Sequence, residues 1–295
     1  MIADSKKEYK IGVLAVLSCQ TIWGFLPIYW QALKPIDSGI IILYRIVTMF
    51  IYCYIGARFK YSRKEIFEPL RDKAIRRKCF TAGLILTANW SLYIWAINSG
   101  RVIQASIGYY IEPIVICLFG IILFHEKLTK YNAAAMVMAL IAILVILFHF
   151  RQLPGVALGL ALSWATYSAI KKTSDKPVMI CLVYETMIYA VIALVAIIVL
   201  EAGGRGALAV AEPGKYALLM LTGLVTCVPI GLFGVCATRV SLFLIGLTQY
   251  ISPTITLIIG IFLFKEPIDI VQIIAFVIVW IGLVFFTIGE FRENK

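Results

Sequence analysis

Long runs of apolar residues alternate with short polar segments along the whole chain. Each run has about the 20 residues that an α-helix needs to cross about 30 Å of hydrocarbon. The boundary between the fifth and sixth runs is marked only by a break at Leu153 and Pro154, and that between the eighth and ninth only by Arg239. The pattern predicts ten spanning helices, at residues 11–30, 39–57, 79–97, 103–124, 131–150, 153–170, 178–200, 216–237, 240–264 and 268–288.

Composition identifies the solvent around these helices. The 295 residues are 62% hydrophobic and only 15% charged, too little charge to cover the surface of a water-soluble domain. The first run follows Lys6 and Lys7 as in a signal peptide, but its apolar stretch continues to Trp30 and is too long for a cleaved segment. We therefore predict an all-α integral membrane protein.

The net charge of +11 raises the question of nucleic-acid binding, but the charges lie in particular loops. Lys and Arg concentrate in the loops on the side of the N-terminus, above all in residues 58–78 (RFKYSRKEIFEPLRDKAIRRK). The positive-inside rule then predicts that both termini are cytoplasmic. We expect this basic segment to lie against anionic lipid headgroups, and we expect no nucleic-acid partner.

The segment GYYIEPIVICLFGIILFHEK has a counterpart 140 residues later, TQYISPTITLIIGIFLFKEP. The same shift sets Arg45 over Glu185. Five helices per half is an odd number, so the halves 1–150 and 151–295 are predicted to form an inverted repeat, an architecture typical of alternating-access transporters. The residues that match in register include Tyr110 and Tyr250, Pro113 and Pro253, Gly120 and Gly260, and Glu126 and Glu266.

Polar groups are costly in hydrocarbon, so polar and aromatic residues that share a helix face are expected to line a central cavity. For the aromatic members, ordinary helix packing is the alternative. The candidate substrate-binding residues are Trp23, Asn89, Trp90, Tyr93, Tyr109, Gln249 and Tyr250.

Four prolines lie inside the predicted spans: Pro27, Pro113, Pro229 and Pro253. Each is predicted to kink its helix. Pro113 and Pro253 should free backbone carbonyls near Tyr109 and Gln249. Two interpretations of these kinks stay open, a substrate site and a simple packing kink.

Three charged residues lie well inside the runs: Arg45, Glu112 and Glu185. Counted from the outer boundary, Arg45 and Glu112 reach similar depths, and we hypothesise an ion pair between them. The pair is either a proton or substrate switch or a fixed bridge between helices. Glu185 is expected in the inner half, and its candidate partners are Lys171, Lys172, Arg239 and Tyr250. Glu126 and Glu266 are interpreted as helix ends.

Longer motifs resemble a known family over essentially the whole chain. TIWGFLPIY and PIVICLFGIILFHEKLT are similar to the EamA type of the drug/metabolite transporter superfamily. NWSLYIWAINSGRVIQASIGYYIEP and ATRVSLFLIGLTQYISPT resemble RarD proteins more specifically. The resemblance implies a transporter. RarD-like proteins can carry Asn in place of Glu112, which implies that the shared mechanism does not require this carboxyl.

Motifs for catalysis, metals or cofactors are not predicted. The seven Cys form no CxxC, the two His form no ligand cluster, and no Ser-His-Asp order or ATP-binding motif occurs. We expect a secondary transporter of the bacterial plasma membrane that moves a small organic solute, such as an amino-acid-like compound, an amphipathic metabolite or a drug. Proton coupling through Glu112 or Glu185 is the first hypothesis. A receptor or scaffold is the alternative, and no oligomeric state is predicted.

Overall fold

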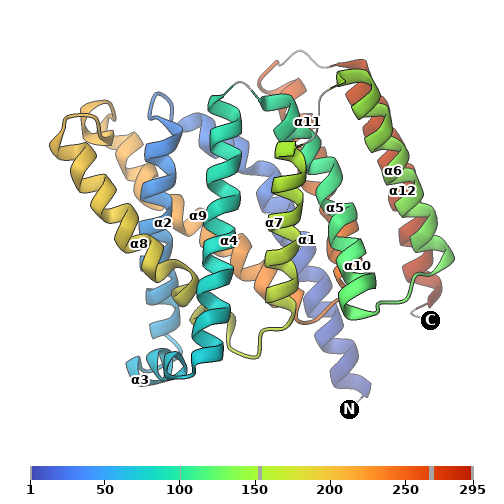
Figure 1. Ribbon diagram of the computed structural model, residues 1–295, viewed down its shortest axis with the longest axis horizontal. Helices are drawn as coiled ribbons and strands as arrows, with labels where there is room; N and C mark the ends of the chain where they lie inside the picture. The colour runs from blue at the N-terminus through green and yellow to red at the C-terminus, as the bar shows by residue number, and fades with distance from the viewer. Residues whose placement is uncertain (1, 100, 152–154, 266–268, 294–295) are drawn as a thin grey trace.

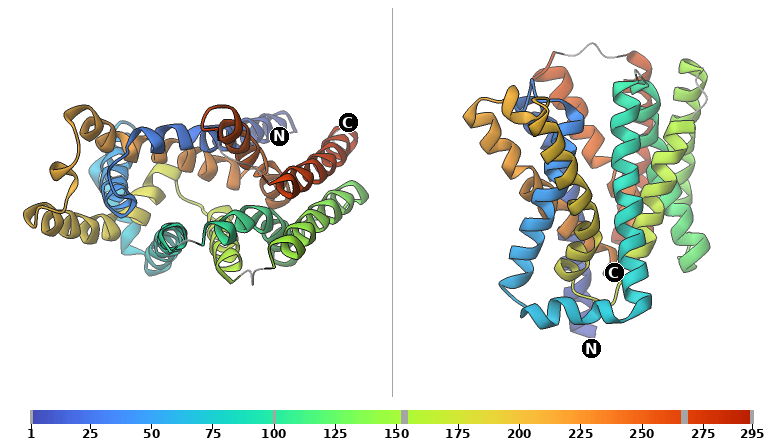
Figure 2. Two further views of the ribbon diagram at one scale, coloured as in Figure 1. Left: turned by 90° about the horizontal axis from the view of Figure 1, so that it is seen from above. Right: turned by 60° about the vertical axis from the view of Figure 1, so that its left-hand side comes forward.

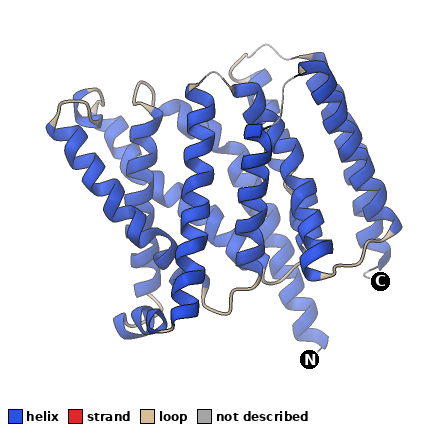
Figure 3. Cartoon of the chain, in the orientation of Figure 1, coloured by secondary structure: helices blue, strands red, loops and turns tan. Residues whose placement is uncertain are grey.

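The computed structural model describes residues 2–99, 101–151, 155–265 and 269–293, and the regular elements in these ranges are all helices (Figures 1 and 3). Two short 3-10 helices, η1 (Glu68–Arg71) and η2 (Ala207–Ala209), accompany the α-helices. The α-helices are α1 (Ile2–Ala32), α2 (Ser38–Arg58), α3 (Arg63–Phe67), α4 (Lys73–Asn98), α5 (Val102–Phe124), α6 (Lys130–Phe150), α7 (Gly155–Lys172), α8 (Val178–Ala202), α9 (Pro213–Ala237), α10 (Leu242–Thr248), α11 (Ile251–Phe262) and α12 (Ile270–Glu293).

Nine segments of the described chain are long and apolar enough to cross a membrane. The predicted sixth run corresponds to α7, which is not among the nine because its 18 residues include several polar side chains and end with two lysines. Apolar side chains cover the outside of the bundle. On α8, for example, Val191, Val195 and Val199 are 61%, 57% and 65% exposed along one face. A multi-pass membrane protein accounts for this surface, since lipid covers it.

Successive long helices run in opposite directions, and both termini lie toward the lower side of Figure 1, where α3 also lies, at the far left. We call this the terminal face and the other end of the bundle the opposite face. Figure 2 shows α6 and α12 side by side at one end of the molecule. The two halves of the chain are interleaved, because helices of residues 1–150 pack mainly against later ones: α1 on α9 and α11, α2 on α8 and α9, α4 on α7 and α8, α5 on α7 and α10, and α6 on α12.

Glycines permit two of these crossings. A Cβ placed on Gly83 in α4 would collide with the backbone carbonyl of Glu185 in α8. A Cβ on Gly223 in α9 would collide with the backbone of Thr48 and Met49 in α2. Small residues allow such close approach of helix backbones in membranes, where tight packing replaces the hydrophobic effect.

Side-chain hydrogen bonds at the terminal face cap the short helix α3 and hold it against the bundle. Ser62 and Glu65 form a capping box at the start of α3, and the Ser62 contacts lower the pKa of the Glu65 carboxyl. Tyr184 of α8 donates a hydrogen bond to the carbonyl of Ile66, which attaches α3 to the bundle.

The predicted ninth run is not one kinked helix. It forms α10 and α11, with a break at Gln249 and Tyr250. The Gln249 carbonyl, which Pro253 was expected to free, accepts a hydrogen bond from the Ser252 N–H at 3.3 Å. This bond spans three residues, as in a 3-10 turn, and satisfies the Gln249 carbonyl.

The other three prolines lie inside unbroken helices. Pro27 lies in α1, Pro113 in α5 and Pro229 in α9. The carbonyl of Tyr110, one residue from the position expected for Pro113, accepts a hydrogen bond from the hydroxyl of Tyr250 at 2.9 Å. This bond joins α5 to the α10–α11 break.

Candidate functional site

A cavity of about 630 Å³ lies among α1, α2, α4, α5, α7, α9, α11 and α12. Trp30 and Gln272, which line it, lie near helix ends at the opposite face. Trp164 and Ile230 line its deep end, near the middle of α7 and in the second half of α9. The cavity therefore extends from the opposite face to about the middle of the bundle, and its size suits a small organic molecule.

Most of the predicted substrate-binding residues line this cavity: Trp23, Asn89, Trp90, Tyr93, Tyr109 and Gln249. Tyr250 does not. Its side chain is 1% exposed, and its hydroxyl donates to the Tyr110 carbonyl. Among the four prolines, Pro27 and Pro253 line the cavity.

Arg45 and Glu112 both line the cavity, but no ion pair joins them among the described residues. The Arg45 guanidinium instead lies over Trp90, 3.7 Å from the ring centroid, and 5.6 Å from the ring of Trp30. Its buried Nε has no hydrogen-bond partner in the described part of the chain. The cation is therefore held by aromatic faces and keeps donors available.

The Glu112 carboxylate is held by a polar relay. Gln249 donates to Glu112 Oε1 at 3.2 Å and accepts from Trp164 Nε1 at 2.6 Å, with the amide orientation assigned from these two partners. Because Gln249 lies at the α10–α11 break, the relay connects this break to α5 and α7.

Asn89 connects α4 to α7. Its side-chain amide donates to the Leu160 carbonyl at 3.0 Å and to the Ser163 hydroxyl at 2.8 Å. Nearby, the rings of Tyr93 and Tyr109 meet edge to face at 6.1 Å. Tyr109 is 44% exposed. These residues form one wall of the cavity.

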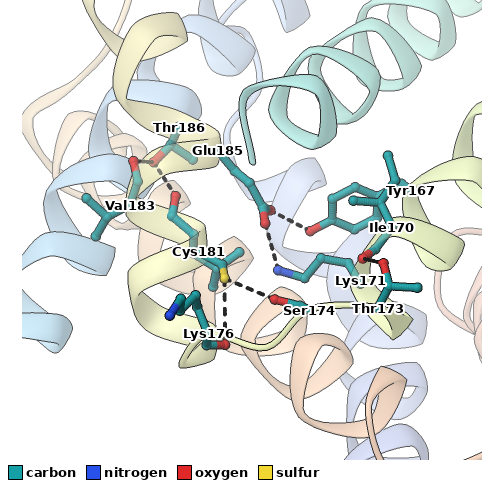
Figure 4. Close-up of polar contacts among 11 residues, drawn as sticks. Tyr167, Ile170, Lys171, Thr173, Ser174, Lys176, Cys181, Val183, Glu185 and Thr186 are labelled. Atoms are coloured by element: carbon teal, nitrogen blue, oxygen red, sulfur yellow. Dashed lines mark hydrogen bonds and ion pairs between the residues drawn. The ribbon is translucent and has the colours of Figure 1, made fainter. Parts of the chain in front are cut away.

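Glu185 does not line the cavity and lies in the first third of α8, closer to the terminal face. Figure 4 shows its polar contacts. Its carboxylate accepts from Lys171 Nζ at 2.8 Å and from the Tyr167 hydroxyl at 2.9 Å. The two charged side chains are only 3% and 2% exposed. The expectation that Lys171 is a partner of Glu185 is confirmed.

The other candidate partners of Glu185 have different contacts. Lys172 pairs with Glu126 at 3.2 Å and donates to the carbonyl of Val240 at 2.8 Å. Arg239 pairs with Glu8 at 2.6 Å. Glu126 also accepts hydrogen bonds from the first two backbone N–H groups of α10, so it joins one helix end to the next. Glu266 lies outside the described residues.

The cavity residues that were not predicted include the polar side chains of Trp164, Gln20 and Gln272. A signal for Trp164 was available, because TIWG around Trp23 and LSWA around Trp164 occupy corresponding places in the two halves. Gln20 lies one turn before Trp23, and its buried Nε2 has no partner among the described residues. The described residues include no group of three or more His, Cys, Asp or Glu that could hold a metal ion.

Comparison with known proteins shows which family this chain belongs to. The model of the EamA-like transporter family matches residues 10–148 and again residues 155–288. The uncharacterized transporter YojE of Bacillus subtilis is 34% identical over 291 residues, 98% of this chain and 97% of its own. Protein RarD of Streptomyces exfoliatus is 32% identical over 293 residues, 99% of this chain and 92% of its own.

More distant proteins are similar over almost the whole chain. Protein RarD of Escherichia coli K12 is 27% identical, with 98% of both chains covered. A crystal structure of another protein, 14% identical, superposes with a TM-score of 0.73 and covers 94% of this chain and 97% of its own. The chain therefore belongs to the EamA-like transporter family, as a relative of the RarD proteins.

Proposed function

We propose that this protein is a secondary active transporter that moves a small organic solute across the bacterial plasma membrane by alternating access. The observation that carries the proposal is the cavity of about 630 Å³, which is lined by polar and aromatic side chains and ends near the middle of the bundle. A scaffold has no need of such a cavity. A transporter that exposes its site to one face at a time does.

The proposal includes ten spans arranged as two inverted repeats of five. The two separate matches to the family model support it, and so do the most extensive helix contacts, whose pairings have counterparts five spans later. The packing of α1 on α9, for example, corresponds to that of α7 on α4. The close crossings at Gly83 and Gly223, 140 residues apart, also support it.

We assign the terminal face to the cytoplasm. The basic segment 58–78, which includes α3, lies at this face, as do Lys171 and Lys172 in the last turn of α7. The positive-inside rule favours this orientation, with both termini cytoplasmic. The cavity then faces the outside of the cell.

The chemistry of the cavity suggests the kind of solute. Arg45 supplies a cation and Glu112 a carboxyl group, and the two do not pair with each other. The rings of Trp23, Trp90 and Trp164 supply flat apolar surface. This combination suits a compact solute with charged or polar groups and an apolar part, including amino-acid-like compounds. Glu112 is the group we assign to proton coupling, because its carboxyl lies in the cavity, whereas Glu185 is enclosed in an ion pair.

A ligand screen tests this function. Purified wild type, Glu112→Gln and the control Glu68→Gln, whose side chain is exposed at the terminal face, are screened by thermal shift against amino acids, amphenicols and polyamines. We expect a ligand that stabilises wild type and the control but not Glu112→Gln. The same ligand should exchange into proteoliposomes that contain the wild type.

The outcomes separate the alternatives. Stabilisation without exchange would support a receptor and contradict transport. Stabilisation and exchange that both survive in Glu112→Gln would move coupling and binding away from this carboxyl. They would leave transport intact, with Arg45, Trp90 and Gln249 as the remaining binding residues.

A further inference from the structure

A second cavity of about 500 Å³ opens at the terminal face. It is bounded by the end of α2, the loop between α7 and α8, and the end of α9, with Lys171 and Gly234 among its lining residues. The first cavity approaches it from the other side, and the two share no lining residue.

Little protein separates the two cavities. On α9, Ile230 lines the first and Gly234 the second, four residues apart, which is about 6 Å along a helix axis. On α7, Trp164 lines the first and Lys171 the second, seven residues apart, or about 10 Å. One to two helical turns are therefore all that blocks a path from face to face.

Four aromatic rings in mutual contact occupy the gap, and we call them the aromatic layer: Trp23, Trp164, Tyr167 and Phe233. Trp164 is at its centre, with ring centroids 5.3 Å from Trp23, 5.4 Å from Tyr167 and 5.1 Å from Phe233. Tyr167 and Phe233 are completely buried. The rings come from α1, α7 and α9, and they meet through ring faces and edges, so a change in helix tilt can separate them without breaking a backbone bond.

The ion pair of Lys171 and Glu185 lies directly below this layer. The Tyr167 hydroxyl donates to Glu185, and Lys171 Nζ lies 5.8 Å from the Tyr167 ring (Figure 4). Lys171 also borders the second cavity, where a Cβ on Gly234 would lie 3.5 Å from its Cε. The pair thus fixes α7, which supplies two of the four rings, to α8.

We propose that the aromatic layer is the closed gate of the transport path at the terminal face, and that the second cavity is the vestibule beyond it. Lys171 and Glu185 act as positioning residues that hold Tyr167 and α7 in the closed arrangement. The inference rests on the proposed function. It adds the location of the barrier and the residues that keep it closed.

The test uses Ser252→Cys as a reporter, since Ser252 lines the first cavity and the seven native cysteines are buried. Vesicles are prepared with the protein in each orientation, identified by access to a C-terminal tag, and treated with a membrane-impermeant, cationic methanethiosulfonate reagent. We expect fast modification from the opposite face and slow modification from the terminal face. Phe233→Ala, which removes a ring from the layer, should raise the rate of modification from the terminal face.

The size of the effect follows from the population of the open state. Minor conformations of two-state proteins are commonly about 0.1–10% populated, so opening the gate should raise the rate from the terminal face by about tenfold or more. Glu185→Gln should do the same by weakening the hold on Lys171, and Lys171→Arg should keep the gate closed. Phe286→Ala, a buried ring that packs on Phe243 away from the layer, is the matched control.

Modification rates unchanged from wild type in both Phe233→Ala and Glu185→Gln, each eluting as a folded protein in gel filtration, would overturn the proposal. Equal acceleration by Phe286→Ala would do so too, because the effect would then be general loosening. The assay needs no substrate, so it reports on the gate even if the ligand screen finds no transported solute. Conversely, transport with unchanged modification rates would refute the gate alone.

Discussion

Glu126 offers a quantitative test of how the bundle is held together at the terminal face. Its Oε1 accepts from the Leu242 N–H at 2.8 Å and its Oε2 from the Phe243 N–H at 2.9 Å. These are the first two backbone donors of α10, and no residue of α10 itself can satisfy them. The Glu126 side chain is 13% exposed, so water replaces these bonds poorly.

The cost of Glu126→Ala can be worked out from these contacts. A hydrogen bond to a charged group contributes about 1.5–3 kcal/mol, so two contribute about 3–6 kcal/mol. Ordering a glutamate side chain costs about 1.5–2 kcal/mol, which the alanine avoids. We therefore expect Glu126→Ala to lower the free energy of unfolding by about 1–4.5 kcal/mol. Glu126→Gln keeps one acceptor oxygen, so it should lose about half as much.

Equilibrium unfolding in mixed micelles with increasing dodecyl sulfate measures these differences. Lys127→Gln is the control, because Lys127 is the exposed neighbour of Glu126, and it should change the unfolding free energy by less than about 0.5 kcal/mol. If Glu126→Ala unfolds like the control, the capping bonds contribute nothing and the reasoning is wrong. If Glu126→Gln is as unstable as Glu126→Ala, the charge, and not the number of acceptors, carries the effect.

Two further predictions concern helix packing and pH. Gly83→Val should lower the unfolding free energy by about 3 kcal/mol or more in the same assay, since a Cβ there meets the Glu185 carbonyl. Gly155→Ala is the control and should be tolerated, because a Cβ at Gly155 meets open space. An equal loss of stability in both variants would contradict the role of close packing at Gly83. The Val271 N–H and His149 lower the pKa of Asp269, so this carboxylate stabilises the fold above its unfolded pKa of about 3.9 and loses that effect as pH falls further. Asp269→Asn should therefore lower the melting temperature at pH 7, and the difference from wild type should shrink steadily as the pH falls below about 3.9. A constant difference at every pH would exclude this linkage.

The sequence predicted the helices well because spanning length is a strong constraint. A run of about 20 apolar residues has few structures open to it in lipid, so helices were expected at the right places. The break at Gln249 and Tyr250 was missed for a physical reason. Pro253 signals that a helix is weakened nearby, but whether it bends or breaks depends on tertiary contacts, here the bond from Tyr250 to Tyr110.

The candidate site was predicted in part. Polar residues in spans must face protein or water, which identified Asn89, Glu112 and Gln249 as cavity residues. The hypothesis of an Arg45–Glu112 ion pair came from depth alone. Depth gives no rotation about the helix axis and no account of neighbours, and Trp90 lies where it captures the guanidinium.

The interleaved packing of the two halves has a consequence for synthesis. A growing chain inserts α6 long before its partner α12 exists, and about 120 intervening residues take about 6–24 s to translate. Insertion must therefore precede assembly, as in the two-stage description of membrane protein folding. A ribosome that stops after residue 150 would leave helices whose polar sides, with Asn89 and Glu112, have lost their partners. Proteolytic clearance is the expected fate of such a fragment.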